Sequence, residues 1–291
     1  MVLASARIGQ RMIEFKFGRT GDLEIVQYCG TPTVYLDHWA LRRISEKETF
    51  ASRFTEALKS RNGTLALSWL NVVEFAKVTM ERQARHVEVL LEANLPRVFF
   101  LEVEPFTVIR KEDKLLVGSA PAPPHADVGF LTAFVQLKPT SLRPFTAHDL
   151  FRIVQGSSLT EHLDRLADSV VDRVEALRDE LEGNAFFRSA VRRLPSGPRI
   201  QRGTRFLLRE MLRTLLVDKR LNITRNHAID LLHAIVPVAY CDLVLLDKHW
   251  HTQVERVRQR FLAAGMSVPM ARVFSEKANG IDQFLSELEK G

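Results

Sequence analysis

The sequence predicts an α/β protein built on a parallel sheet. Between residues 33 and 103, short apolar runs alternate with helical patterns in the order strand, helix, strand, helix, strand. That order implies right-handed crossovers, which place the strands parallel to one another. The runs are apolar almost throughout, as expected for strands that are covered on both faces. The length of 291 residues suits one large domain or two ordinary ones.

The first half of the chain supplies three of the expected strands. Residues 1–31 predict an appended β-hairpin. Residues 11–17 alternate in polarity as one strand, 18–22 are typical of a turn, and 23–26 form the returning strand. A strand is expected at 33–37, a helix at 39–59 and a second strand at 64–68. Ser68 is expected to cap a long helix that reaches about residue 93, since its hydroxyl can accept a free backbone N–H. A third strand is expected at 97–103.

The pattern then breaks and resumes about a hundred residues later. Residues 105–203 predict a mainly helical insertion that adds no strand to the centre of the sheet, with its clearest helix at 159–182. Helices follow at 204–218 and from Thr224 or Asn226 to 240. Strands are expected at 243–246 and 271–275, and helices at 250–264 and 281–290.

Four acidic residues stand at the ends of strands or near the starts of helices. Asp37 and Asp247 each end an apolar run, and ligands of open α/β sheets bind at the carboxyl ends of strands. Glu74 and Asp230 lie early in predicted helices. Each residue also has an ordinary interpretation, as a helix cap, a solvated side chain or a partner of the helix dipole. By contrast, Asp242 should stand at the opposite edge of the sheet, because five residues of strand span roughly 16 Å.

A cluster of carboxylates predicts a metal site. Several carboxyl groups in one pocket do not all ionise unless cations neutralise them, because their negative charges repel one another. Oxygen ligands select hard cations, so Mg²⁺ or Mn²⁺ is the expected cofactor.

The charge of the chain is distributed unevenly. Residues 161–182 carry eight acids and three arginines, whereas residues 188–225 carry eleven basic residues and two acids. The basic block is a candidate contact surface for nucleic-acid phosphates, and the alternative is a solvated face that offsets the acidic helix. The residues expected to contact phosphate are Arg199, Arg202, Arg205, Arg209 and Arg213.

The strand and acid pattern resembles the PIN domain, a family of metal-dependent nucleases. The matching segments are residues 34–37, residues 67–68 with Glu74, and residues 230–234 with 243–248. The first two acids are 37 positions apart and the last two 17, both usual for the family, but the second and third are 156 apart. The resemblance therefore assigns residues 32–104 and 204–291 to a PIN-like domain and residues 105–203 to an insertion.

The resemblance implies a three-layer α/β/α fold with a five-stranded parallel sheet. It also implies hydrolysis of phosphodiesters, most often in RNA, by a metal-activated water, with Asp37, Glu74, Asp230 and Asp247 as metal ligands. Supporting positions around these ligands would be Ser68, Asn71, His38 and His233. Two positions depart from the family pattern, since His38 replaces a small polar residue and Leu245 a hydroxyl residue. The competing hypothesis is therefore a weakened or inactive PIN-like scaffold that binds RNA or a protein.

The remaining features indicate the setting of the protein. No stretch of about 18 apolar residues predicts a membrane span, and the N-terminus lacks the pattern of a secretory signal. Cys29 and Cys241 give neither a disulfide framework nor a metal-ligand spacing, which fits a reducing cytoplasm. Nucleic acid, preferably RNA, is the expected partner, while a protein partner, an inhibitor or a second copy of the chain stays open.

Overall fold

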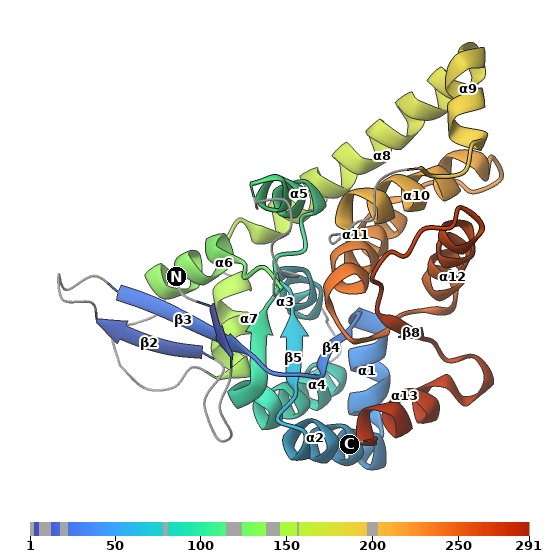
Figure 1. Ribbon diagram of the computed structural model, residues 1–291. Helices are drawn as coiled ribbons and strands as arrows, with labels where there is room; N and C mark the ends of the chain where they lie inside the picture. Colours follow the sequence, from blue (N-terminus) through green and yellow to red (C-terminus); the bar gives the residue numbers. More distant parts are fainter. Residues whose placement is uncertain are drawn as a thin grey trace.

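A computed structural model describes residues 3–5, 13–17, 23–77, 81–114, 124–137, 146–155, 157–196 and 203–290. Its centre is a five-stranded sheet in the order β6-β5-β4-β7-β8, in which every pairing is parallel (Figure 1). The α/β class with a five-stranded parallel sheet is thus confirmed. The strands are β4 (Thr33–Leu36), β5 (Thr64–Leu67), β6 (Val98–Phe100), β7 (Leu243–Leu245) and β8 (Arg272–Phe274).

The chain winds away from β4 in two directions. β5 and β6 lie on one side of β4, whereas β7 and β8 lie on the other. Four of these strands, β4, β5, β6 and β7, are buried along their length, which agrees with their apolar composition. The point where the order reverses, between β4 and β7, is the place where open α/β sheets bind ligands.

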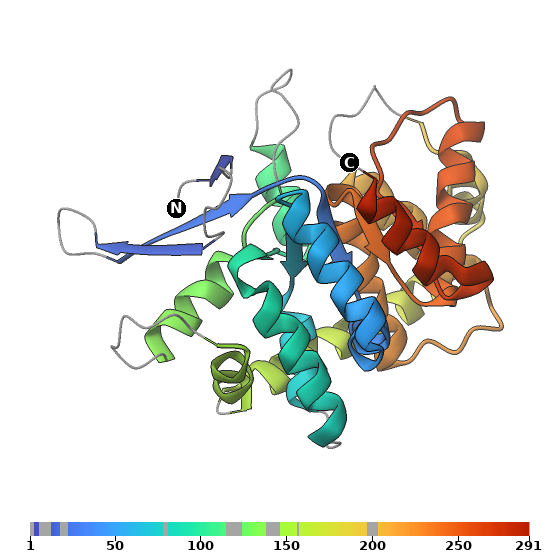
Figure 2. The ribbon, with the colours of Figure 1, turned by 90° about the horizontal axis from the view of Figure 1, so that it is seen from below.

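Two groups of helices accompany the sheet. α1 (His38–Glu46), α2 (Glu48–Ser60), α4 (Glu81–Asn94) and α13 (Gly280–Glu289) pack side by side (Figure 2). α10 (Thr204–Val217), α11 (Arg225–Tyr240) and α12 (Lys248–Ala263) form the second group. This arrangement is compatible with a three-layer α/β/α fold.

Two long helices expected from the sequence are each divided in the structure. The segment expected at 39–59 breaks at Lys47, whose backbone is extended, to give α1 and α2. The segment expected from Ser68 to about 93 contains α3 (Trp69–Ala76) and α4. Ser68 does cap α3, because its hydroxyl accepts the Asn71 N–H at 3.3 Å. Periodicity alone gave no sign of either break, since no Gly or Pro stands at Lys47.

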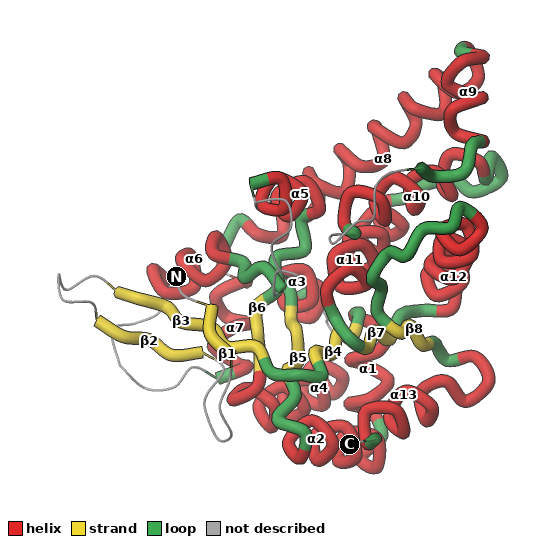
Figure 3. Tube along the Cα trace, in the orientation of Figure 1, coloured by secondary structure: helices red, strands yellow, loops and turns green. Residues whose placement is uncertain are grey.

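The N-terminal segment forms a separate small sheet rather than a simple hairpin (Figure 3). β2 (Ile13–Phe17) and β3 (Leu23–Cys29) pair antiparallel as expected, and β1 (Leu3–Ser5) adds a parallel strand to β3. The turn expected at 18–22 lies outside the described residues. The buried Gln27 side chain accepts the Phe100 N–H at 2.8 Å, so β3 covers the edge strand β6 of the main sheet.

All elements that the structure describes between residues 105 and 203, the span expected to be an insertion, are helices. They are α5 (Pro105–Asp113), α6 (Val128–Leu137), α7 (Ala147–Gln155), α8 (Leu159–Gly183) and α9 (Ala185–Arg192). None of the strands in the central sheet comes from this span. Its apolar residues, such as Leu163 and Val174, belong to the same hydrophobic core as the sheet. The proline-rich stretch at 118–123 lies outside the described residues.

α8 passes along α11 and α3, and its far end projects with α9 beyond the rest of the molecule (Figure 1). Within the described ranges, no helix is long and apolar enough to span a lipid bilayer.

Candidate functional site

Asp37 and Asp247 meet at the carboxyl ends of β4 and β7. Asp37 follows β4 and caps α1, with its Oδ1 accepting the Ala40 N–H at 2.7 Å. Its Oδ2 accepts the Asp247 N–H at 2.9 Å. Asp247 in turn caps α12, because its Oδ1 accepts the Trp250 N–H at 2.8 Å. The two aspartates are therefore joined across the point where the strand order reverses, and both also serve as the helix caps that were the ordinary interpretation.

Glu74 and His233 form a close pair beside these aspartates. Glu74 lies in α3 and His233 in α11, and His233 Nε2 stands 2.6 Å from Glu74 Oε2. Burial alone would raise the pKa of Glu74, but the charge and the hydrogen bond of His233, together with the charges of His38 and Lys77, lower it. Burial would conversely lower the pKa of His233, and the neighbouring carboxylates, Glu74 first, raise it instead.

Asp230 completes the group of acids from one turn before His233 on α11. Burial raises the pKa of Asp230 to about 7, and the charges of Asp247 and Glu74 act in the same direction. Burial likewise raises the pKa of Asp37 to about 7, with Asp247 adding to the rise. Because the charge of Asp247 acts on both Asp37 and Asp230, and that of Glu74 acts on Asp230, the four acids lie in one region of the structure.

The expected supporting residues surround this group. Tyr35 was not singled out in the sequence, yet its hydroxyl lies 2.5 Å from His233 Nδ1 and 3.0 Å from Ser68 Oγ. Ser68 Oγ donates to Asn71 Oδ1 at 2.8 Å. His38 stacks on Phe75, with 4.4 Å between ring centroids, and burial lowers its pKa. The hydroxyl of Tyr35 had no signal in the sequence, because it lies within an apolar strand.

The four acids do not form a ready-made metal cage. Across the part of the chain that the structure describes, no set of three or more His, Cys, Asp or Glu side chains is arranged to hold an ion. Protein donors already engage both oxygens of Asp37, one of Asp247 and one of Glu74. Within the same residues, no hydrogen bond is seen to Asp247 Oδ2 or Glu74 Oε1, which carboxylate chemistry would offer to a hard cation.

The expected phosphate-binding arginines fall into three groups. Arg199 and Arg202 lie outside the described residues. Arg205 pairs with Asp113 at 2.6 Å, with its side chain 59% exposed. Arg213 pairs with Glu210 at 3.1 Å, and that buried carboxylate also pairs with Arg260. Arg213 is therefore largely structural.

Arg209 is exposed on α10, and no ion pair of it is seen among the described residues. It is thus the one of the five that is described and free for a phosphate. A basic pocket of about 510 Å³, which was not predicted from the sequence, lies at the α8–α9 end and is lined by Arg188, Arg192 and Lys219 among others. The sequence shows that these three residues belong to the basic block 188–225, but only the fold shows that they line one pocket.

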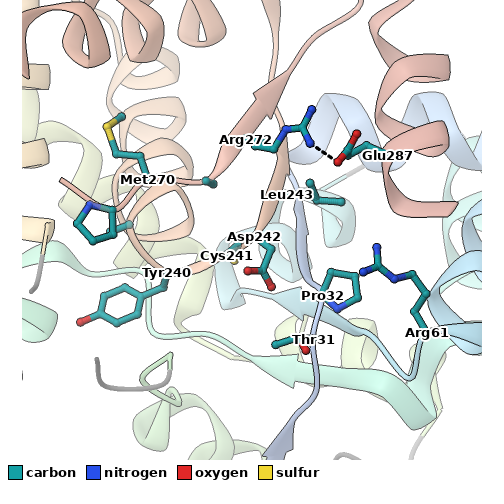
Figure 4. Close-up of a pocket in the computed structure, with 13 residues that line it drawn as sticks. Thr31, Pro32, Arg61, Tyr240, Cys241, Asp242, Leu243, Met270, Arg272 and Glu287 are labelled. Carbon is teal, nitrogen blue, oxygen red and sulfur yellow. Dashed lines mark hydrogen bonds and ion pairs between the residues drawn. The ribbon is translucent and has the colours of Figure 1, made fainter. Parts of the chain in front are cut away.

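A second pocket lies at the opposite, amino-terminal edge of the sheet (Figure 4). Its volume is about 550 Å³, and its lining includes Thr31, Asp242 and Arg272 but none of the four acids. Asp242 accepts the Thr33 N–H at 2.7 Å, so it connects the starts of β4 and β7. Asp242 and Asp247 therefore stand at opposite edges, as the length of a strand requires.

Comparison with known proteins identified no relative of this chain. No protein family matches this chain, and neither a curated protein nor a solved structure matches it.

Proposed function

We propose that this chain is a divalent-metal-dependent nuclease with a PIN-like domain, and that RNA is its preferred substrate. The observation that carries the proposal is the junction of Asp37 and Asp247 at the point where the strand order reverses. Glu74 and Asp230 approach the same edge from two further helices. Acids from four separate elements are costly to gather without a function, because burial and repulsion disfavour their charge.

The donor chemistry fits a hard cation, although the oxygens would have to turn toward it. Asp37, Asp230, Asp247 and Glu74 would hold Mg²⁺ or Mn²⁺. A bound ion of this kind makes water more acidic and offsets charge on phosphate oxygens. The helix caps of Asp37 and Asp247 fix the backbone at this edge of the sheet. Both oxygens of Asp37 accept backbone N–H groups, whereas Asp247 keeps its Oδ2 without a hydrogen-bond partner among the described residues.

The basic surface of α9 and α10 would hold the substrate strand. Arg209, Arg188 and Arg192 carry positive charge without a carboxylate partner among the described residues. Contacts of this kind bind phosphates and do not read sequence. The exposed Phe186 lies on the same helix as Arg188 and could stack a base, whereas Phe187 packs against the core.

The test is cleavage by the purified full chain with Mn²⁺ or Mg²⁺. Labelled single-stranded and duplex RNA and DNA are incubated with the wild type, Asp247→Asn and the matched variant Asp242→Asn. We expect cleavage, strongest on RNA, that a chelator abolishes. Asp247→Asn should lose it and Asp242→Asn should keep it. Cleavage that persists in the chelator, or in Asp247→Asn, would exclude a metal mechanism at this edge.

A second candidate is a PIN-like scaffold that binds RNA or a protein without cutting. It is favoured by the engaged carboxylates, since Glu74 pairs with His233 and Asp37 accepts two backbone N–H groups. The same experiment separates the candidates: the scaffold binds RNA in gel-shift assays but yields no cleavage and no metal-induced rise in melting temperature.

A further inference from the structure

The basic pocket of about 510 Å³ lies where the end of α8, α9 and the end of α10 meet. We call it the α9 pocket. Its lining consists of four basic residues, one acid and three apolar residues, which are Arg188, Arg192, Arg213, Lys219, Glu182, Leu181, Val191 and Val217. The basic residues exceed the acid by three charges, so the pocket is a site for an anion.

α8 fixes the first guanidinium group of the pocket. Arg188 Nη1 donates to the Leu181 carbonyl at 3.2 Å and also to the Glu182 carbonyl, both in the last turn of α8. The final carbonyls of a helix favour a cation. An arginine has five N–H donors, and no hydrogen bond from Nε or Nη2 of Arg188 is seen among the described residues. Arg188 is therefore held in place with donors left for an anion.

The second guanidinium group belongs to a buried cluster with an excess of positive charge. Arg213 Nε and Arg260 Nε donate to the same oxygen of Glu210, at 3.1 and 2.7 Å. The two arginines are 18% and 20% exposed and Glu210 is 2% exposed, so two cations share one anion away from water. Burial, and then the charge of Arg260, lower the pKa of Arg213. An anion bound beside Arg213 would offset this excess charge.

The other two basic side chains of the α9 pocket are accessible to a ligand. Lys219 pairs with Glu182 at 2.8 Å, and both side chains are more than half exposed. Such an exposed pair contributes little to stability, so Lys219 can turn to a phosphate at small cost. Arg192 is exposed, and no ion pair of it is seen within the part of the chain that the structure describes.

The charge of the lining fits the end of a nucleic-acid strand better than its middle. A phosphate inside a strand is a diester with one negative charge, whereas a phosphomonoester carries about 1.5 to 2 negative charges at pH 7. Guanidinium groups also match phosphate oxygens in pairs, which favours a phosphate over a single-atom anion.

The α9 pocket is remote from the four acids. Lys77, which follows α3 one turn after Glu74, pairs with Asp164 near the start of α8 at 3.0 Å. Leu181 stands 17 positions further along α8, which is roughly 25 Å at the rise of an α-helix. A phosphate in the pocket is therefore not the phosphate that the acidic edge would hydrolyse.

We propose that the α9 pocket binds the terminal phosphate of a nucleic-acid strand, and of RNA first. Arg188, Arg192, Arg213 and Lys219 hold this phosphate by charge and hydrogen bonds. That the bound strand is a substrate rests on the proposed nuclease function, whereas the recognition of a terminal phosphate does not.

The test compares the binding of three single-stranded RNAs of one sequence to the full chain. They carry a 5′-phosphate, a 3′-phosphate or hydroxyls at both ends, and each has the same internal fluorescent label. Anisotropy is measured in a chelator, so that no metal-dependent cleavage occurs. One of the phosphorylated RNAs should bind about tenfold more tightly than the hydroxyl RNA, because charged partners strengthen the added hydrogen bonds. Equal binding of all three RNAs would overturn the proposal.

The double variant Arg192→Gln, Lys219→Gln shows whether the preference belongs to the α9 pocket. Both side chains are exposed, so the variant should fold, and it should lose most of the preference for a terminal phosphate. Arg43→Gln is the matched control, because Arg43 is an exposed arginine of α1 that pairs with Glu46. It should keep the full preference. An unchanged preference in the double variant would overturn the proposal.

A free nucleoside monophosphate separates a strand end from a small ligand. It should displace the phosphorylated RNA only in large excess, since it lacks the contacts of the strand. Displacement at equal concentration would refute the strand as the ligand. If the preference were found in a protein that cleaves no RNA with Mn²⁺ or Mg²⁺, the nuclease function would be refuted and the pocket would stand. Cleavage without any preference would refute the pocket alone.

Discussion

Replacing Asp37 by asparagine should change the stability of the metal-free protein in a pH-dependent way. Burial raises the pKa of Asp37 from 3.8 to about 7. Between these values the folded state holds a proton that the unfolded chain has lost, so stability falls as the pH rises through this window. At about 1.4 kcal/mol per pKa unit, the ionised side chain costs the folded state roughly 4 kcal/mol above pH 7.

The Asp37→Asn variant would escape this cost but lose one hydrogen bond. The carbonyl oxygen of the new side chain can still accept the Ala40 N–H, but its amide would face the Asp247 N–H, which Asp37 Oδ2 now accepts at 2.9 Å. An unmatched buried donor costs about 1–3 kcal/mol. Asp37→Asn should therefore be neutral or destabilising at pH 5 and stabilising at pH 8, a relative gain of about 2–3 kcal/mol between the two.

Urea unfolding at pH 5 and pH 8 in a chelator measures this difference. Asp242→Asn is the control, since it also loses a backbone hydrogen bond, from Thr33, and it should destabilise the protein at both pH values. Added Mn²⁺ should then stabilise the wild type at pH 8 but not Asp37→Asn, because an ion that binds only the folded state raises stability by mass action. Equal effects of Asp37→Asn at the two pH values would refute the reasoning.

Three further outcomes are expected. Arg209→Gln should weaken RNA binding equally for all sequences and flatten the slope of log affinity against log salt by somewhat under one unit; an unchanged slope would make Arg209 a solvated residue only. Arg213→Gln should instead lower the melting temperature, because it removes a partner of Glu210, whose side chain is 2% exposed; equal stability would contradict this. Leu163→Ala, at a fully buried site of α8, should cost about 2–5 kcal/mol in a single unfolding transition; two transitions would mean that the insertion folds by itself.

The sequence predicted the sheet because its strands are buried, apolar and bounded by clear breaks. Asp37 and Asp247 could be placed at one edge from strand direction alone, and the opposite position of Asp242 followed from strand length. The break at Lys47 could not be predicted, because no Gly or Pro stands there to mark the end of a helix. The Glu74–His233 pair joins positions 159 residues apart, so only the assembled fold could reveal it. One local feature of the sequence pointed to His233: it lies one turn after Asp230, on the same face of a predicted helix.

The position of β4 at the centre of the sheet sets the order in which the site can assemble. Val34 pairs with Leu65 on one side and with Leu243 on the other, so one edge of β4 has no partner until nearly the whole chain has been synthesised. Until then Asp37 also lacks the Asp247 N–H. A chain that stops within the insertion would expose an unpaired apolar strand, the kind of edge that invites association with other chains. The acidic edge is thus a property of the finished polypeptide, formed only when its last third joins its first.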